Sequence, residues 1–283
     1  MQEGTIAGPG GVPVYFRKYG NGHRGVVVPN AAWLARDLEV LTRDRTVVFY
    51  DPRGRGESGS LTDKSPVTLA GETEDLDLIR RHCGFDHIAI LSWSYHGMVG
   101  ANYAARNPDI VERLIVSGPM PPPYADQAAA TMQSRLDMQA IQELMKSPPA
   151  DPAAITEAWH TILMRGYFAA GGAYARGLPE PRRSANEQIG NVNRHYAAFL
   201  ESVRDWDWRA AARQYPGPVL LLHGSGDFVP LEGSREWQSL FLNARLEVIP
   251  NAGHFIWLEQ PELFFAAVNQ FLDAGKLSNT AVR

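Results

Sequence analysis

The chain has 283 residues, 45% of them hydrophobic, which is enough to build one α/β domain with an insertion. Its 27 basic and 31 acidic residues are spread along the sequence and leave a formal net charge of −4, so it lacks the basic field that nucleic-acid binding requires. Cys83 is the single cysteine of the chain, which excludes an internal disulfide framework and a cysteine-based metal site.

Short apolar runs alternate with helix-like stretches along most of the chain. The expected strands are 12–19, 25–28, 46–50, 87–91, 113–117, 218–223 and 244–249, and residues 5–6 extend the first of them into an antiparallel edge. The expected helices are 32–41, 68–83, 95–106 and 261–274. Because strand and helix alternate, the pattern predicts a mostly parallel, doubly wound α/β sheet.

The alternation stops after Ser117, where several prolines interrupt the chain and no strand pattern returns before Pro218. The intervening stretch is rich in alanine and is helix-like over 128–146, 152–164 and 186–204. It therefore predicts a helical cap, residues 120–214, inserted into a core that residues 1–119 and 215–283 form.

A candidate nucleophile stands where the strand expected over 87–91 continues into the helix expected over 95–106. A sharp strand-to-helix turn holds its residue in a strained conformation and lifts the side chain above the sheet. The helix that follows favours negative charge at its amino terminus. Ser94 occupies this joint, and the alternative interpretation is that it only caps the helix.

The sequence Ser-Trp-Ser-Tyr-His-Gly at residues 92–97 resembles the nucleophile elbow of the α/β-hydrolases, usually written Gly-x-Ser-x-Gly. Ser92 is a small departure from that pattern, and His96 is a bulky one. The resemblance implies an α/β-hydrolase fold with the chain order serine, acid, histidine. The turn at 225–227 and the loop at 251–255 resemble the family's acid turn and histidine loop, so the expected triad is Ser94, Asp227 and His254.

The same resemblance implies an oxyanion hole made of two backbone N–H groups. Tyr95 supplies the first donor because it follows the nucleophile, and Ala31 supplies the second from an early loop. That loop reads Pro29-Asn30 where the family commonly shows His-Gly. Asn30 tolerates a left-handed conformation and carries an amide that can donate to an anion, although shaping the turn is the alternative role.

The sequence Asp-Pro-Arg-Gly-Arg-Gly-Glu-Ser at 51–58 resembles a further family turn, to which we assign an architectural role. Aromatic and histidine side chains near the elbow and in the cap are the candidate substrate contacts: Trp33, Trp93, His160, Tyr167 and Tyr196. The region after the elbow looks most like prolyl aminopeptidases and nearby esterases. Prolyl aminopeptidases bind the substrate's amino terminus with cap carboxylates, for which Glu180, Glu187 and Glu201 are the candidates here, and a solvated face is the alternative place for each.

The residues therefore predict a serine hydrolase that cleaves a small ester, lactone or amide through an acyl-enzyme. An aminopeptidase is one alternative. A non-hydrolytic protein on the same scaffold, such as a ligand receptor, lyase, cyclase or acyl transferase, is the other.

The expected partner is a small-molecule substrate, with no metal, nucleotide or redox cofactor and with a homodimer left open. The sequence has no secretory signal at its amino terminus and no apolar run long enough to span a membrane, so the expected location is the cytoplasm.

Overall fold

The β-branched and aliphatic runs form one mixed sheet in a computed structural model, which describes residues 1–43, 45–61, 67–169 and 185–274. The strands are β1 (Gln2–Ala7), β2 (Pro13–Tyr19), β3 (Arg24–Pro29), β4 (Val47–Asp51), β5 (His87–Trp93), β6 (Val111–Ser117), β7 (Val219–Gly224) and β8 (Ala244–Ile249). Within the described residues their order across the sheet is β1-β2-β4-β3-β5-β6-β7-β8. The β1–β2 and β2–β4 pairs are antiparallel and the other pairs are parallel, which confirms the predicted mostly parallel sheet and its antiparallel edge.

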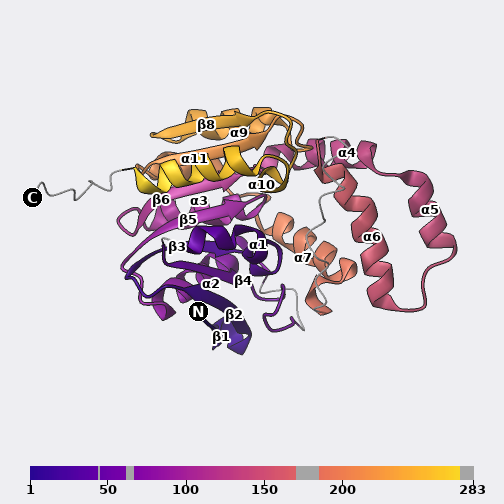
Figure 1. Ribbon diagram of the computed structural model, residues 1–283, viewed down its shortest axis with the longest axis horizontal. Helices are drawn as coiled ribbons and strands as arrows, with labels where there is room; N and C mark the ends of the chain where they lie inside the picture. The colour runs from indigo at the N-terminus through magenta and orange to yellow at the C-terminus, as the bar shows by residue number, and fades with distance from the viewer. Residues whose placement is uncertain (44, 62–66, 170–184, 275–283) are drawn as a thin grey trace, which may run out of the picture.

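Helices cover both faces of this sheet (Figure 1). The α-helices that the structure describes are α1 (Ala31–Leu38), α2 (Leu69–His82), α3 (His96–Arg106), α4 (Ala125–Arg135), α5 (Met138–Lys146), α6 (Pro152–Tyr167), α7 (Ile189–Ser202), α8 (Trp208–Gln214), α9 (Leu231–Leu240), α10 (Ile256–Glu259) and α11 (Pro261–Asp273). Helices α1, α10 and α11 pack on one face, and α2, α3, α8 and α9 pack on the other.

Successive strand residues supply the two apolar cores that lie on either side of the sheet. Val27 belongs to the core beneath α2 and α3, whereas its neighbours Val26 and Val28 belong to the core beneath α1 and α11. Side chains alternate between the faces of a strand, so a strand covered on both faces must be apolar throughout. This requirement explains the continuous apolar runs in the sequence.

The helices α4 to α7, which we call the cap helices, lie in the chain between β6 and α8, and α8 leads into β7. Figure 1 shows them beside one end of the sheet, with α5 farthest from it. Helices α4, α6 and α7 contribute, with the carboxyl ends of the strands, to the pocket described below. The division into a core and a cap of residues 120–214 stays a prediction.

The helix expected over 128–146 is wrong in one respect, because the chain leaves the helical conformation at Leu136 and starts α5 afresh. Leu136 has a ψ of 142°, and the Asp137 side chain accepts a hydrogen bond of 2.9 Å from Ala140 N. An aspartate that caps a new helix in this way competes with continuation of the old one. The alanine-rich composition conceals this break.

Candidate active site

Ser94 lies at the joint between β5 and α3 with a φ of +58°, a backbone conformation that residues with a side chain seldom adopt. Its N–H donates to the carbonyl of Ser117 on the neighbouring strand at 2.9 Å. The helix behind it packs closely on β6, since a Cβ atom added to Gly97 would meet Val116 Cγ1 at 2.4 Å. This packing holds the turn tight and leaves the Ser94 side chain partly exposed in a pocket.

Asp227 and His254 form a buried hydrogen-bonded pair. Asp227 follows β7 and His254 follows β8, and His254 Nδ1 lies 3.0 and 2.9 Å from the two Asp227 carboxylate oxygens. Both side chains are fully buried. Burial alone would raise the pKa of Asp227, but the charge and hydrogen bond of His254 outweigh it and hold that pKa below the ordinary value. The carboxylate is therefore ionised and fixes the orientation of the imidazole.

The second ring nitrogen of His254 differs from the first in that it lacks a hydrogen bond within the described part of the chain. The buried Nε2 atom has no partner among the residues that the structure describes, and Ser94 Oγ is thus not hydrogen-bonded to it. The rings of Trp93, Tyr167 and Phe228 lie 4.9, 5.3 and 4.7 Å from the imidazole, and all three rings line the pocket that contains Ser94. Catalytic hydrogen bonds often tighten only when substrate is present.

Gly118 lies close to all three candidate residues. It follows Ser117, the residue that binds Ser94 N, and it has a φ of +57°. A Cβ atom at this position would lie 2.8 Å from His254 Nδ1 and 3.2 Å from Asp227 Oδ2. The Asp227–His254 pair thus packs directly on the chain segment that holds the Ser94 turn.

Gly118→Ala is expected to lower kcat about a hundredfold, because the new methyl group displaces the imidazole and a shift of about 1 Å costs that much. The left-handed backbone adds strain of about 1–3 kcal/mol. Steady-state turnover of p-nitrophenyl butyrate and a thermal melt measure the two effects.

Gly84→Ala is the matched control, since Gly84 has a φ of +68° and a Cβ there meets no described atom within 4 Å. It should show the strain and keep the turnover. Equal turnover in both variants would contradict the contact.

The junction of β3 and α1 carries two of the candidate oxyanion residues, Asn30 and Ala31. Asn30 takes the left-handed conformation, with φ 70° and ψ 57°, and Ala31 begins α1. The first N–H groups of a helix have no intrahelical acceptor. Asp51 accepts a hydrogen bond of 2.7 Å from the next of them, Ala32 N. Burial raises the pKa of Asp51 to about 6, although this hydrogen bond and one from Glu57 N act to lower it. Asp51 thereby anchors the first turn of α1.

The Asn30 side chain lies in the same pocket as Ser94 and is 2% exposed. Its Oδ1 atom has no hydrogen-bond partner within the described ranges, which fits neither a helix cap nor a turn-stabilising bond. Asn30 lines the pocket, as does Tyr95, whereas Ala31 does not. The oxyanion roles of these three residues stay predictions.

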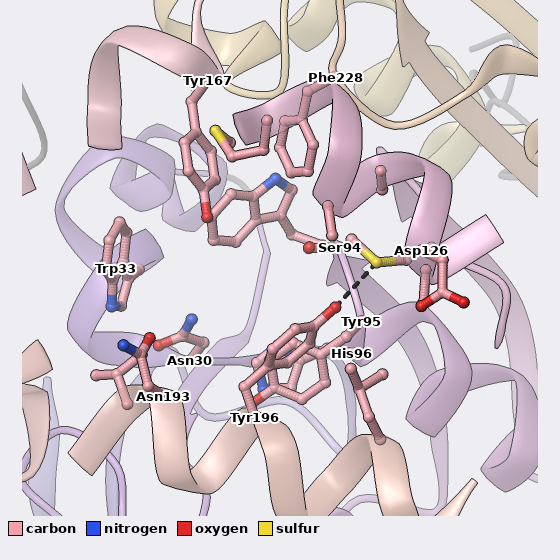
Figure 2. A pocket seen from close by; sticks show the side chains of 18 of the residues that line it. Asn30, Trp33, Ser94, Tyr95, His96, Asp126, Tyr167, Asn193, Tyr196 and Phe228 are labelled. Carbon is pink, nitrogen blue, oxygen red and sulfur yellow. Dashed lines mark hydrogen bonds between the residues drawn. The ribbon is translucent and has the colours of Figure 1, made fainter. Parts of the chain in front are cut away.

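The pocket has a volume of about 390 Å³ and an apolar wall in which aromatic rings are prominent (Figure 2). Four of the predicted substrate contacts line it: Trp33, Trp93, Tyr167 and Tyr196. The cap helices add small and aliphatic side chains, chiefly Ala128 and Met132 from α4 and Val192 from α7. Tyr196 donates to Met120 Sδ at 3.0 Å, which is the dashed line in Figure 2.

His160 is placed differently from the sequence prediction, because it is buried outside the pocket lining and its ring packs 5.6 Å from that of Trp33. It supports a residue that lines the pocket. His96, the bulky departure in the elbow, is accommodated beneath Tyr95, with their rings 4.0 Å apart. Burial lowers the pKa of His96 to about 4, so it is neutral near pH 7.

Sequence reasoning missed Arg55, which lines the pocket and is nearly fully buried. Its guanidinium binds the Glu187 carboxylate through Nε at 2.9 Å and Nη2 at 3.0 Å. The available signal was a second arginine inside a turn whose glycines predict close packing. A buried guanidinium requires a partner, and that partner had to come from elsewhere in the chain.

Within the described helices, none is both long and apolar enough to cross a membrane. The described residues also contain no cluster of three or more histidine, cysteine, aspartate or glutamate side chains arranged to hold a metal ion.

Comparison with known proteins places these features in a wider context. A family model described as alpha/beta hydrolase fold matches residues 20–261. A pimeloyl-[acyl-carrier protein] methyl ester esterase of Aromatoleum aromaticum is 29% identical over 184 residues, which are 62% of this chain and 70% of that protein. A proline iminopeptidase of Heyndrickxia coagulans is 24% identical over 279 residues, 94% of this chain and 92% of that protein. The structure of an esterase from Exiguobacterium antarcticum superimposes with a TM-score of 0.70 at 19% sequence identity. The match covers 95% of this chain and 99% of the esterase chain.

Proposed function

Since the chain belongs to the alpha/beta hydrolase fold family, we propose that it is a serine hydrolase that cleaves a small carboxylic ester through an acyl-enzyme on Ser94. One observation carries the proposal: a serine with a φ of +58° faces an apolar pocket next to a buried histidine that is already bound to an ionised aspartate. A serine that merely caps a helix has no need of a strained backbone or of this neighbouring pair.

In the proposed reaction, Ser94 Oγ attacks the substrate carbonyl carbon while His254 Nε2 accepts its proton. Asp227 holds the proton on Nδ1 and stabilises the imidazolium that forms. The tetrahedral intermediate then breaks its bond to the leaving alcohol, which takes the proton from His254. A water molecule attacks the acyl-enzyme by the same route in reverse, releasing the acid and restoring Ser94.

The negative charge of the tetrahedral intermediate needs donors that are already in place. Tyr95 N and Ala31 N stand at the amino termini of α3 and α1, where the backbone N–H groups lack intrahelical acceptors. The Asn30 amide, which lines the same pocket, is a third candidate. We assign the oxyanion hole to these groups.

The chemistry of the pocket favours a neutral, apolar acyl group over a charged amino terminus. Of the cap carboxylates that the sequence suggests for amine binding, Glu187 is bound to Arg55, and Glu201 is exposed and paired with Arg204. Glu180 lies outside the described residues. Asp126 lines the pocket but is exposed to solvent, where a single ion pair contributes little.

This difference predicts a preference between two matched amides. We expect cyclopentanecarboxylic naphthylamide to be cleaved with a kcat/KM at least about a hundredfold higher than proline naphthylamide, in which an ammonium replaces one ring carbon. Burying that charge without a partner costs about 3 kcal/mol or more, and 1.4 kcal/mol is tenfold. A fluorescence assay of released naphthylamine compares them, and a preference for the proline compound would favour the aminopeptidase instead.

The test of the proposed function is turnover of p-nitrophenyl esters of increasing acyl length by the native protein. We expect hydrolysis that saturates with substrate and disappears in Ser94→Ala. Tight binding of an ester that is never hydrolysed, and that survives Ser94→Ala, would support a ligand receptor on the same scaffold.

A further inference from the structure

Glu187 is a fully buried carboxylate carried by the short 3₁₀ turn Ala185–Glu187, just before α7. It accepts two hydrogen bonds from the Arg55 guanidinium at 2.9 and 3.0 Å, one from Gly56 N at 2.8 Å and one from Trp33 Nε1 at 2.8 Å. Burial alone would raise its pKa, but the charge of Arg55 and these hydrogen bonds lower that pKa to about 2. The carboxylate is therefore ionised and fully satisfied.

The side chains bonded to Glu187, Trp33 and Arg55, connect it to both backbone donors that we assign to the oxyanion hole. Trp33 lies in the first turn of α1, two residues after Ala31. Arg55 donates through Nη1 to the Tyr95 hydroxyl at 3.2 Å, and Tyr95 carries the donor that follows Ser94. Figure 2 shows Trp33 on one side of the pocket and Tyr95 with Ser94 on the other.

We propose that Glu187 is a positioning residue for the oxyanion hole, through which the segment leading into α7 sets the geometry of both backbone donors. This inference rests on the proposed serine hydrolase. Glu187 touches neither the substrate nor the reacting atoms, and it acts through Trp33 on one side and through Arg55 and Tyr95 on the other.

The physical basis is the low dielectric around this ion pair. A buried guanidinium that loses its carboxylate must find another acceptor or draw water into the site. Either change moves the Tyr95 ring and the first turn of α1. The donors of an oxyanion hole stabilise the transition state more than the bound substrate, so an error in their positions reduces kcat rather than binding.

Glu187→Gln removes the charge and keeps the shape of the side chain. We expect kcat for p-nitrophenyl butyrate to fall by about tenfold to a thousandfold, the range of losing part or all of one oxyanion donor, with KM changed by less than about threefold. The second-order rate of Ser94 labelling by a fluorophosphonate should fall by a similar factor, because its phosphoryl oxygen needs the same donors. Trp33→Phe, which removes one donor to Glu187 and keeps an aromatic ring, should show a smaller fall of the same kind.

Two control variants separate positioning from a loss of cap structure. Glu201→Gln makes the same substitution on α7 at an exposed ion pair with Arg204 and should leave both kinetic constants unchanged. His195→Asn breaks a different bridge between α7 and the core, the 2.9 Å contact of His195 with Glu72. If only the docking of the cap helices matters, His195→Asn should reproduce the kinetic effect of Glu187→Gln.

The proposal is overturned if Glu187→Gln keeps the native kcat and labelling rate, or if His195→Asn reproduces its kinetic effect, whether that effect is a lowered kcat or a raised KM. Circular dichroism and thermal melts show whether each variant is folded, and Trp33→Phe carries the test if Glu187→Gln is not. A native protein that neither hydrolyses esters nor reacts with the fluorophosphonate would overturn the proposed function itself, a result distinct from those above.

Discussion

Ser94→Ala is expected to reduce the turnover of p-nitrophenyl esters about a million-fold, which is the usual cost of losing the nucleophile of a serine triad. Alanine keeps the compact side chain at a position with a φ of +58° but removes the oxygen that forms the acyl bond. The residual rate should come from the oxyanion donors and the pocket alone. Stopped assays at high protein concentration measure it, and circular dichroism checks that the variant is folded.

Ser92→Ala is the matched control for this substitution. Ser92 lies two residues earlier on β5, is fully buried and donates to the carbonyl of Ile115 at 3.3 Å. Its loss should reduce stability slightly and leave kcat close to the native value. Loss of activity in Ser92→Ala together with retention in Ser94→Ala would mean that the elbow is assigned in the wrong register.

Asp227→Asn is expected to lower kcat about ten-thousandfold, because an amide in this place no longer fixes the imidazole tautomer in which Nε2 accepts a proton. Both Asp227 oxygens now lie within 3.0 Å of His254 Nδ1. KM should change little, since Asp227 does not line the pocket. Steady-state kinetics over a range of ester concentrations separate the two constants.

Asp109→Asn, an exposed site after α3, makes the same chemical change away from the pair and should keep native kinetics.

The substitution of Asp227 also bears on stability. Its pKa is lower in the folded protein than its ordinary value of 3.8, so the ionised form stabilises the fold above about pH 4, and this contribution is lost as the pH falls through the folded-state pKa. Native kcat in Asp227→Asn would exclude it as the acid of the site.

The strand-to-helix joint made the elbow predictable from the sequence, and the resemblance to the α/β-hydrolases supplied the two later turns, at 225–227 and 251–255. A buried strand that meets a helix without a linker leaves one residue at the joint, and Ser94 occupies it with the expected strain. Asp227 and His254 each follow a late parallel strand, and the carboxyl ends of parallel strands meet at one edge of a sheet. Their hydrogen bond is consistent with that rule.

The partners of buried charges were not predictable, because long-range contacts leave no local pattern. Arg55 and Glu187 are 132 residues apart in sequence, and nothing beside either residue marks the other. The place of His160 in the expected cap makes it a candidate substrate contact, but it does not line the pocket and its ring packs 5.6 Å from that of Trp33. The same limit applies to Glu187, which the sequence suggests as an amine-binding carboxylate and the structure pairs with Arg55.

The most direct test of the central claim is labelling of the native protein with a fluorophosphonate, followed by intact mass and peptide mapping. We expect one phosphonyl group per chain, on the peptide that contains Ser94, and a labelling rate that falls steeply in His254→Gln, which removes the general base. An unlabelled protein, or a label on another serine while Ser94 remains free, would contradict the assignment of Ser94 as the nucleophile.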